Sequence, residues 1–143
     1  MAREMRSDEI DELLDEQYVA RLGCRSGDEI YVVPVAYARD GRAIHVFSYE
    51  GRKLEMMRRE PRVCVEIDDI EHFGRWRSVI GWGKFEELAG EDRARAKALL
   101  ARRLEPEIFD SISKKRLEAA MADDPAPVVF RIRLETITGR AEG

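Results

Sequence analysis

The stretch with the clearest chemical potential is IHVFSYEGRK, residues 44–53, in which a hydroxyl, a glycine and two adjacent cations follow an apolar run. Arg52 and Lys53 come directly after Gly51 and open a segment with a helical pattern. Backbone N–H groups lack partners at a helix N-terminus, and the helix dipole is positive there. Because arginine adds a two-pronged donor and lysine a point charge, this arrangement is typical of a site for a phosphate group.

The two cations also have a simpler interpretation. A cation in the first turn of a helix is unfavourable by about 0.3 kcal/mol or more unless an anion binds beside it. Arg52 and Lys53 could instead be solvated side chains that pair with Glu50 or Glu55. On these residues alone, both interpretations stay open.

The hydrophobic pattern around this stretch predicts a chain of strands interrupted by helices. Alternating or β-branched runs predict strands over 18–25, 30–38, 43–49, 62–68, 75–88 and 128–139. Helical periodicity predicts helices over 7–16, 53–60, 91–104 and 107–121. Hairpin connections predominate, so we expect a mostly antiparallel sheet, and six bent strands are most simply closed into a β-barrel with helices packed outside it.

Three residues within these strands carry positional information. Pro34 cannot donate a ladder hydrogen bond, so the strand over 30–38 either lies at an edge or is interrupted where something else approaches. Gly81 and Gly83 predict bending or a close backbone approach in the strand over 75–88. In the helix over 91–104, the expected apolar stripe consists of Ala94, Ala98, Leu99 and Leu104.

Composition limits the class of protein. The chain has 143 residues, the size of one domain, and we treat residues 1–143 as a single domain. Its net charge of −4 argues against general nucleic-acid binding. No apolar run is long enough to span a bilayer and the N-terminus lacks a signal-peptide core, so we expect a cytoplasmic protein. Cys24 and Cys64 lack a CxxC spacing and are expected to be reduced thiols, and the distance in sequence between His45 and His72 predicts no metal site.

Three segments together resemble a known superfamily. They are YVVPVAYARDG (31–41), IHVFSYEGRKLEMMRREPRVCVEID (44–68) and WRSVIGWGKFEEL (76–88). In this order and spacing they resemble the FMN-binding split-barrel proteins, which include pyridoxamine 5'-phosphate oxidase and the nitroimidazole-resistance-type flavoproteins. The resemblance covers roughly residues 10–90 and implies a mainly β split barrel with peripheral helices.

The resemblance also implies a set of cofactor-binding residues. Gly51, Arg52 and Lys53 would grip the phosphate of FMN. Two strands would line the flavin through Val46, Phe47 and Ser48, and through Val33, Pro34, Val35 and Ala36. Ser78 matches a position whose side chain contacts the flavin, and Trp76 or Arg77 would close the pocket from the partner subunit. The implied assembly is a homodimer with two FMN sites at the subunit interface.

Some departures from the family pattern bear on activity. Phe47 stands where nitroimidazole-type relatives often carry a histidine, and the final strand lacks the substrate motif of true pyridoxamine-phosphate oxidases. His45 shares a strand face with Phe47, so it either lies near the ring or is a packed or surface histidine. No side chain is assigned as a catalytic acid, base or nucleophile.

The resulting functional expectation is an FMN-dependent oxidoreductase that acts on a small molecule, such as a nitroaromatic or a quinone-like acceptor. Two alternatives stay open at this point. One is a flavin-binding or flavin-storage protein without catalytic activity. The other is a relative that has exchanged its cofactor for haem or a deazaflavin.

Overall fold

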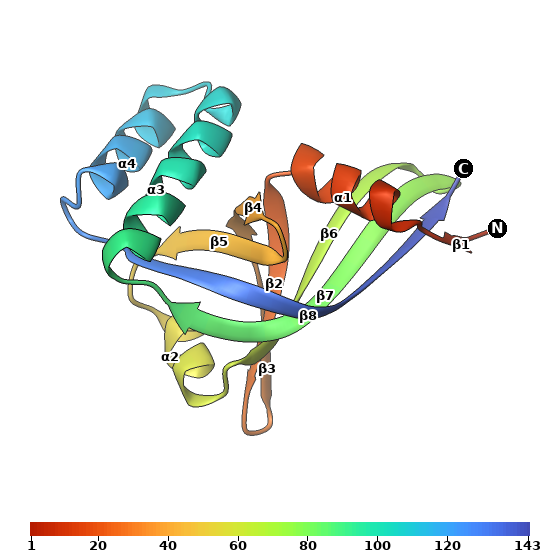
Figure 1. Ribbon diagram of the computed structural model, residues 1–143, viewed down its shortest axis with the longest axis horizontal. Helices are drawn as coiled ribbons and strands as arrows, with labels where there is room; N and C mark the ends of the chain where they lie inside the picture. The colour runs from red at the N-terminus through yellow and green to blue at the C-terminus, as the bar shows by residue number, and fades with distance from the viewer.

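The computed structural model describes all residues, Met1–Gly143, as one eight-stranded antiparallel sheet with four α-helices (Figure 1). The strands are β1 (Arg3–Glu4), β2 (Val19–Ser26), β3 (Glu29–Ala36), β4 (Ala38–Asp40), β5 (Ala43–Ser48), β6 (Arg62–His72), β7 (Arg75–Glu87) and β8 (Val128–Glu142). The helices are α1 (Ser7–Glu16), α2 (Arg52–Arg59), α3 (Gly90–Leu104) and α4 (Ser111–Met121), with a short 3₁₀ turn, η1 (Glu105–Glu107), after α3.

The sheet curls back on itself. Its strand order is β3-β2-β6-β7-β8-β5-β4, with β1 added on β8. The two end strands, β3 and β4, are consecutive in the chain and are joined through Tyr37. The Tyr37 backbone N–H donates to the Tyr18 carbonyl at 2.9 Å, and its buried hydroxyl donates to the Leu14 carbonyl at 2.6 Å. This junction brings the two edges of the sheet together, which confirms the expected split barrel.

The barrel interior holds the main core. Inward-facing residues of β2, β6 and β8, such as Leu22, Ile67 and Ile132, are fully buried. The helices α1 and α2 close this core with apolar residues that are fully buried or nearly so, namely Leu13, Leu14, Leu54 and Met57. Burial of apolar area is the main stabilising contribution here, so removing any one of these side chains would cost about 2–5 kcal/mol.

The long strands β7 and β8 are bent at two glycines. A Cβ atom on Gly83 would lie 2.0 Å from the Arg133 carbonyl oxygen, and one on Gly81 would lie 2.8 Å from the Leu134 side chain. The register between the two strands shifts between Trp82 and Gly83. The expected close backbone approach is therefore confirmed at Gly83, where only glycine leaves room for the backbone of β8, whereas Gly81 makes room for a leucine side chain.

The structure differs from the expected strand count. Tyr37 divides the predicted strand over 30–38 into β3 and β4, and the two-residue strand β1 pairs with the end of β8. Eight strands therefore replace the expected six. Pro34 lies in β3, which pairs with β2 and ends the sheet, so the prediction that Pro34 belongs to an edge strand is confirmed.

The buried face of α3 also differs from the prediction. Ala96, Leu100 and Leu104 are buried, whereas Ala94 and Ala98 of the expected stripe are exposed. The expected stripe was therefore rotated relative to the true one, since alanines occur on both faces of this helix. Figure 1 shows α3 and α4 side by side, with α3 against β5, and α1 placed over the far part of the sheet. No helix in the chain is both long and apolar enough to cross a membrane.

Candidate functional site

The start of α2 offers unsatisfied backbone donors. Gly51 is the N-cap, in an extended conformation with φ 173°, and no side chain caps the helix. The first helical hydrogen bond runs from the Glu55 N–H to the Gly51 carbonyl at 3.2 Å. The N–H groups of the first turn are therefore free to donate to an anion at this corner of the molecule, which consists of Gly51, Arg52 and Lys53.

The two cations of this corner do not pair as the simpler interpretation expected. Arg52 forms an ion pair with Glu29 on β3, and its guanidinium lies 5.9 Å from the centre of the Tyr31 ring. Glu50 is instead bound to Arg58 by two hydrogen bonds of 2.6 and 2.7 Å. Lys53 is half-buried and has no ion-pair partner. The corner therefore keeps one uncompensated cation beside the free amides.

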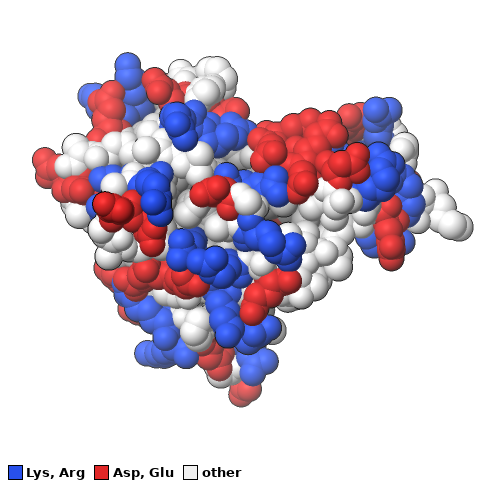
Figure 2. Space-filling view, in the orientation of Figure 1, with Lys and Arg blue, Asp and Glu red and all other residues white.

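The charge pattern of the surface agrees with this local picture. In the view of Figure 2, Lys and Arg side chains gather over the part of the surface that α2 occupies, with some Asp and Glu among them, while Asp and Glu gather over α1. An anion approaching this face would be attracted toward α2 and repelled from α1.

The candidate residues of β5 occupy three different environments. Val46 points into the barrel and is buried, so its side chain belongs to the core. Phe47 points the other way and packs beneath α3, among Ala38, Leu100 and Leu88. Ser48 is half-buried, and its hydroxyl donates to the Tyr49 carbonyl at 3.3 Å. Of these three, only Ser48 presents a polar side chain near the corner.

The candidate residues of β3 lie on an edge that has no second hydrogen-bonded neighbour. Val33 and Val35 are half-buried against the core, while Pro34 and Ala36 are exposed. On its free side β3 contacts β5 without pairing to it. Its backbone groups on that side are therefore available to a ligand beside Ser48 and the start of α2.

The remaining candidates lie at the opposite end of the molecule. Ser78 pairs with Arg140 near the C-terminal end of β8, whereas Ser48 pairs with Val128 at its first residue. Twelve residues of extended strand span about 40 Å. In Figure 1 the β6–β7 turn lies beside the C-terminus, far from α2. One chain therefore does not bring Ser78 and its neighbours to the corner at α2.

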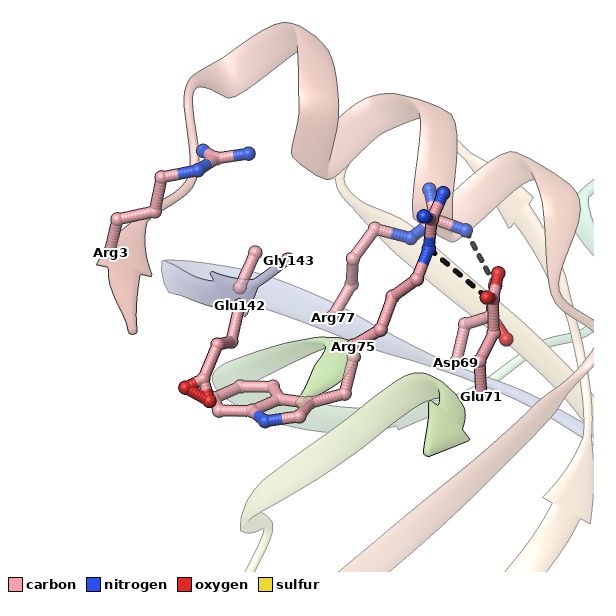
Figure 3. A pocket seen from close by; sticks show the side chains of 9 residues that line it. Arg3, Asp69, Glu71, Arg75, Arg77, Glu142 and Gly143 are labelled. Carbon is pink, nitrogen blue, oxygen red and sulfur yellow. Dashed lines mark hydrogen bonds and ion pairs between the residues drawn. The ribbon is translucent and has the colours of Figure 1, made fainter. Parts of the chain in front are cut away.

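Arg77 is held by acidic residues at this far end. Its guanidinium donates to Asp69 at 2.8 Å and to Glu16 at 3.0 Å, and the hydrogen bond to Asp69 raises the pKa of Arg77 above its usual value. Figure 3 shows Arg77 and Arg75 pointing toward Asp69 and Glu71 across a shallow pocket. Trp76 lines the same pocket and is half-buried.

Ser78 has a partner that sequence reasoning did not single out. Its hydroxyl donates to Glu66 at 2.8 Å, and Glu66 also lies 3.4 Å from Arg21. Burial, followed by a hydrogen bond with Asp68, raises the pKa of Glu66. The alternation of the strand over 62–68 placed Glu66 and Asp68 on its outward face, and this was the only signal available.

The outward face of the sheet carries an exposed apolar band. Val32, Gly23, Cys64 and Trp82 lie in one row across β3, β2, β6 and β7. Val32 is 62% exposed and Trp82 is 40% exposed, and the adjacent Ile30 is 75% exposed. Exposed bulky apolar side chains that lie side by side on a sheet are typical of a protein interface. This band lies between the corner at α2 and the far end that carries Ser78.

Comparison of the sequence with known proteins identifies its family. The sequence profile of the pyridoxamine 5'-phosphate oxidase family matches residues 6–141. An uncharacterized protein of Rhizobium meliloti (strain 1021) is 30% identical over 128 residues, which cover 86% of this chain and 83% of the relative.

Solved structures show the same fold. A FAD-binding protein of Mesorhizobium loti is 29% identical, with a TM-score of 0.77 and coverage of 100% of this chain and 99% of that one. A candidate 5-nitroimidazole antibiotic resistance protein of Bacteroides thetaiotaomicron also shares the fold, with a TM-score of 0.77 and 19% identity. The match covers 99% of this chain and 87% of that protein. Because the family profile spans nearly the whole sequence, the chain belongs to the pyridoxamine 5'-phosphate oxidase family.

Proposed function

We propose that the protein is an FMN-binding flavoprotein that works as a homodimer and oxidises or reduces a small molecule. The observation that carries this proposal is the corner at α2, where uncapped amides and an unpaired Lys53 stand beside the free edge of β3. A phosphate group would satisfy these amides and this charge together. A bound flavin would supply the redox chemistry, and the protein would supply its binding and orientation.

The residues at the corner fit the parts of a flavin mononucleotide. The phosphate would take the first-turn amides and Lys53, and Arg52 would exchange or share its contact with Glu29. Ser48 would lie along the ribityl chain. The unpaired backbone groups of β3 would hydrogen-bond to the polar edge of the ring. Pro34 has no backbone N–H, so the strand loses no hydrogen-bond donor to a neighbouring strand at that residue.

The distance between the two halves of the candidate site supports a dimer. Trp76, Arg77 and Ser78 lie at the far end of β8, so they would reach a flavin only from the partner subunit. The exposed band around Trp82 offers the apolar surface on which two copies could pack. In the resulting two-fold assembly each corner would face the far end of the other chain.

Purification followed by a visible spectrum tests the cofactor. We expect a yellow protein with the absorption of oxidised flavin that bleaches when NADH or NADPH is added without oxygen. A flavin that never bleaches would instead support a flavin-binding protein without catalytic activity. A Soret band would indicate haem, and a colourless protein that ignores added FMN would overturn the proposal.

A second cofactor has a specific observation in its favour. The similar Mesorhizobium loti protein, which aligns over the whole chain, binds FAD. Denaturing the protein and separating the released flavin by chromatography distinguishes the two cofactors. Release of FMN is the expected result, and release of FAD would replace FMN in the proposal without moving the phosphate corner.

A further inference from the structure

A polar cavity lies under α3, on the side of the sheet away from the barrel core. His45 of β5 and Arg131 of β8 are cross-strand neighbours in register and form its floor. Asp92, Arg95 and Arg102 of α3 line the opposite wall, with Asp40 of β4 beside them. The hollow has a volume of about 370 Å³, enough for a small ligand and not only for a single water molecule.

His45 is a buried polar residue whose imidazole ring makes no hydrogen bond. Only 5% of the residue is exposed, and its Nδ1 atom is buried without any hydrogen-bond partner. Its Nε2 atom lies 3.9 Å from a carboxylate oxygen of Asp40, which is too long for a hydrogen bond. Nδ1 has no accessible surface, so a ligand in the cavity cannot reach it. Nε2 also lacks a hydrogen bond but is not fully buried, so it is the ring nitrogen that His45 offers to the cavity.

The charges around the cavity are not balanced. Arg95 is bound to Asp92, and Arg131 is bound to Glu86 of β7 at 2.9 Å. Arg102 has no ion-pair partner, so it is the uncompensated cation of the cavity. Of the two acids that line the cavity, Asp40 is the one without an arginine partner, and its side chain is 75% exposed.

We propose that this cavity is a binding site for a small oxyanion, a phosphate or carboxylate group, held by Arg102, Arg131 and the imidazole of His45. Guanidinium groups bind both kinds of oxyanion with paired N–H donors, and the imidazole would donate to the anion from Nε2, its accessible nitrogen. The site is distinct from the corner at α2, because His45 lies beneath α3 and Lys53 lies at the start of α2. The proposal therefore does not depend on flavin binding.

Binding at this site would be coupled to a proton. Burial lowers the pKa of His45, and Arg131 lowers it further, while Asp40 and Asp92 act in the opposite direction. The imidazole is therefore mostly neutral at pH 7 when the cavity holds no anion. An oxyanion would favour the charged imidazolium, so binding would take up a proton and become tighter as the pH falls.

Nuclear magnetic resonance of the two histidine side chains tests the proposal. The probes are inorganic phosphate and acetate, added separately to the ¹⁵N-labelled full-length protein. A variant with Arg52→Gln and Lys53→Gln serves as the background, so that phosphate does not bind at the α2 corner. Either anion should shift the His45 nitrogen signals and raise the pKa of His45, while the exposed His72 on β6 should not respond.

Two variants make the result specific. Arg102→Gln should weaken the anion response of His45 about tenfold or more, because it removes a charge-assisted contact. Arg116→Gln, which removes an exposed cation from α4, should leave the response unchanged. A response to phosphate and not to acetate would restrict the ligand to phosphate groups. If His45 ignores both anions at tens of millimolar, or responds equally in Arg102→Gln, the cavity only holds water and the proposal is wrong.

Discussion

The two ends of β8 carry similar cations in opposite states. At the end that begins with Val128, the corner at α2 holds free amides, an unpaired Lys53 and an Arg52 whose single partner is an exposed glutamate. At the other end Arg77 is bound by two acids, and Arg75 is bound by Glu71 at 3.0 Å. The first region leaves backbone donors and one positive charge without partners, whereas in the second region the charges are already paired.

This difference teaches that a cation near a candidate site is informative only together with its partners. Both ends contribute residues to the proposed flavin site, but they would do so differently. The corner would supply affinity through the phosphate, and the far end of the partner would supply shape and a hydroxyl. Changes at the two ends should therefore have effects of different size.

The largest effect is expected at the corner. Replacing Arg52 and Lys53 together by alanine should weaken flavin binding by about 3–6 kcal/mol, because each charge-assisted contact contributes about 1.5–3 kcal/mol. The dissociation constant is measured by flavin fluorescence quenching. Arg59→Ala, which removes an exposed cation from the last turn of the same helix, is the matched control and should bind flavin normally. Equal losses in both variants would mean that general surface charge, and not the corner, determines affinity.

The next largest effect is expected from the apolar band that separates the two ends. Trp82→Arg should convert the proposed dimer to a monomer in sedimentation measurements and lower flavin affinity by about tenfold or more, although Trp82 is not assigned to the flavin site. Ile112→Arg changes another exposed apolar residue, which is 65% exposed on α4, and should leave the dimer intact. A monomeric Trp82→Arg protein with normal flavin affinity would place the whole site in one chain.

Changes at the far end should have smaller effects. Ser78→Ala should cost about 1 kcal/mol of flavin binding through the loss of one hydroxyl. Arg77→Gln should mainly lower the free energy of unfolding, because it breaks the contacts to Asp69 and Glu16. Chemical denaturation and flavin titration on the same samples separate the two quantities. If Arg77→Gln reduced flavin affinity as strongly as the Arg52→Ala, Lys53→Ala variant, the corner at α2 would not be the main source of flavin affinity.

The smallest effect concerns pH and the α3 cavity. Burial lowers the pKa of His45 in the folded protein below the ordinary value near 6.5, so the unfolded chain binds more protons between these two values. Stability should therefore fall as the pH drops below about 6.5, with a slope of at most about 1.4 kcal/mol per pH unit for one proton. His45→Gln should remove this part of the slope without changing flavin affinity. An unchanged slope in that variant would mean that other groups determine it.

Much of the architecture could be predicted from local patterns. The alternation of RVCVEID places Val63, Val65 and Ile67 inside, and all three are buried. The break at Tyr37 could not be predicted, because an aromatic residue inside a β-branched run looks like continued strand. Its bend depends on distant partners, Tyr18 and Leu14, which no local pattern reveals.

The candidate site was predictable only in part. The anion corner follows from the order Gly51, Arg52, Lys53 at a helix start, and the structure keeps those amides uncapped. The separation of Ser48 from Ser78 could not be predicted, because it depends on which ends of β8 they pair with. Residue types and spacing indicate what a site could bind, but strand order decides which residues share it.

The most direct test of a site shared between two chains is a mixing experiment with two defective variants. One is the Arg52→Ala, Lys53→Ala protein, and the other is Ser78→Trp, designed to block the far end; circular dichroism checks that both are folded. If each flavin contacts the corner of one chain and the far end of the other, mixed dimers contain one intact site. An equal mixture, unfolded and refolded together, should then recover about a quarter of the wild-type flavin content. No recovery above the separate variants would contradict the account and place both halves of the site within one chain.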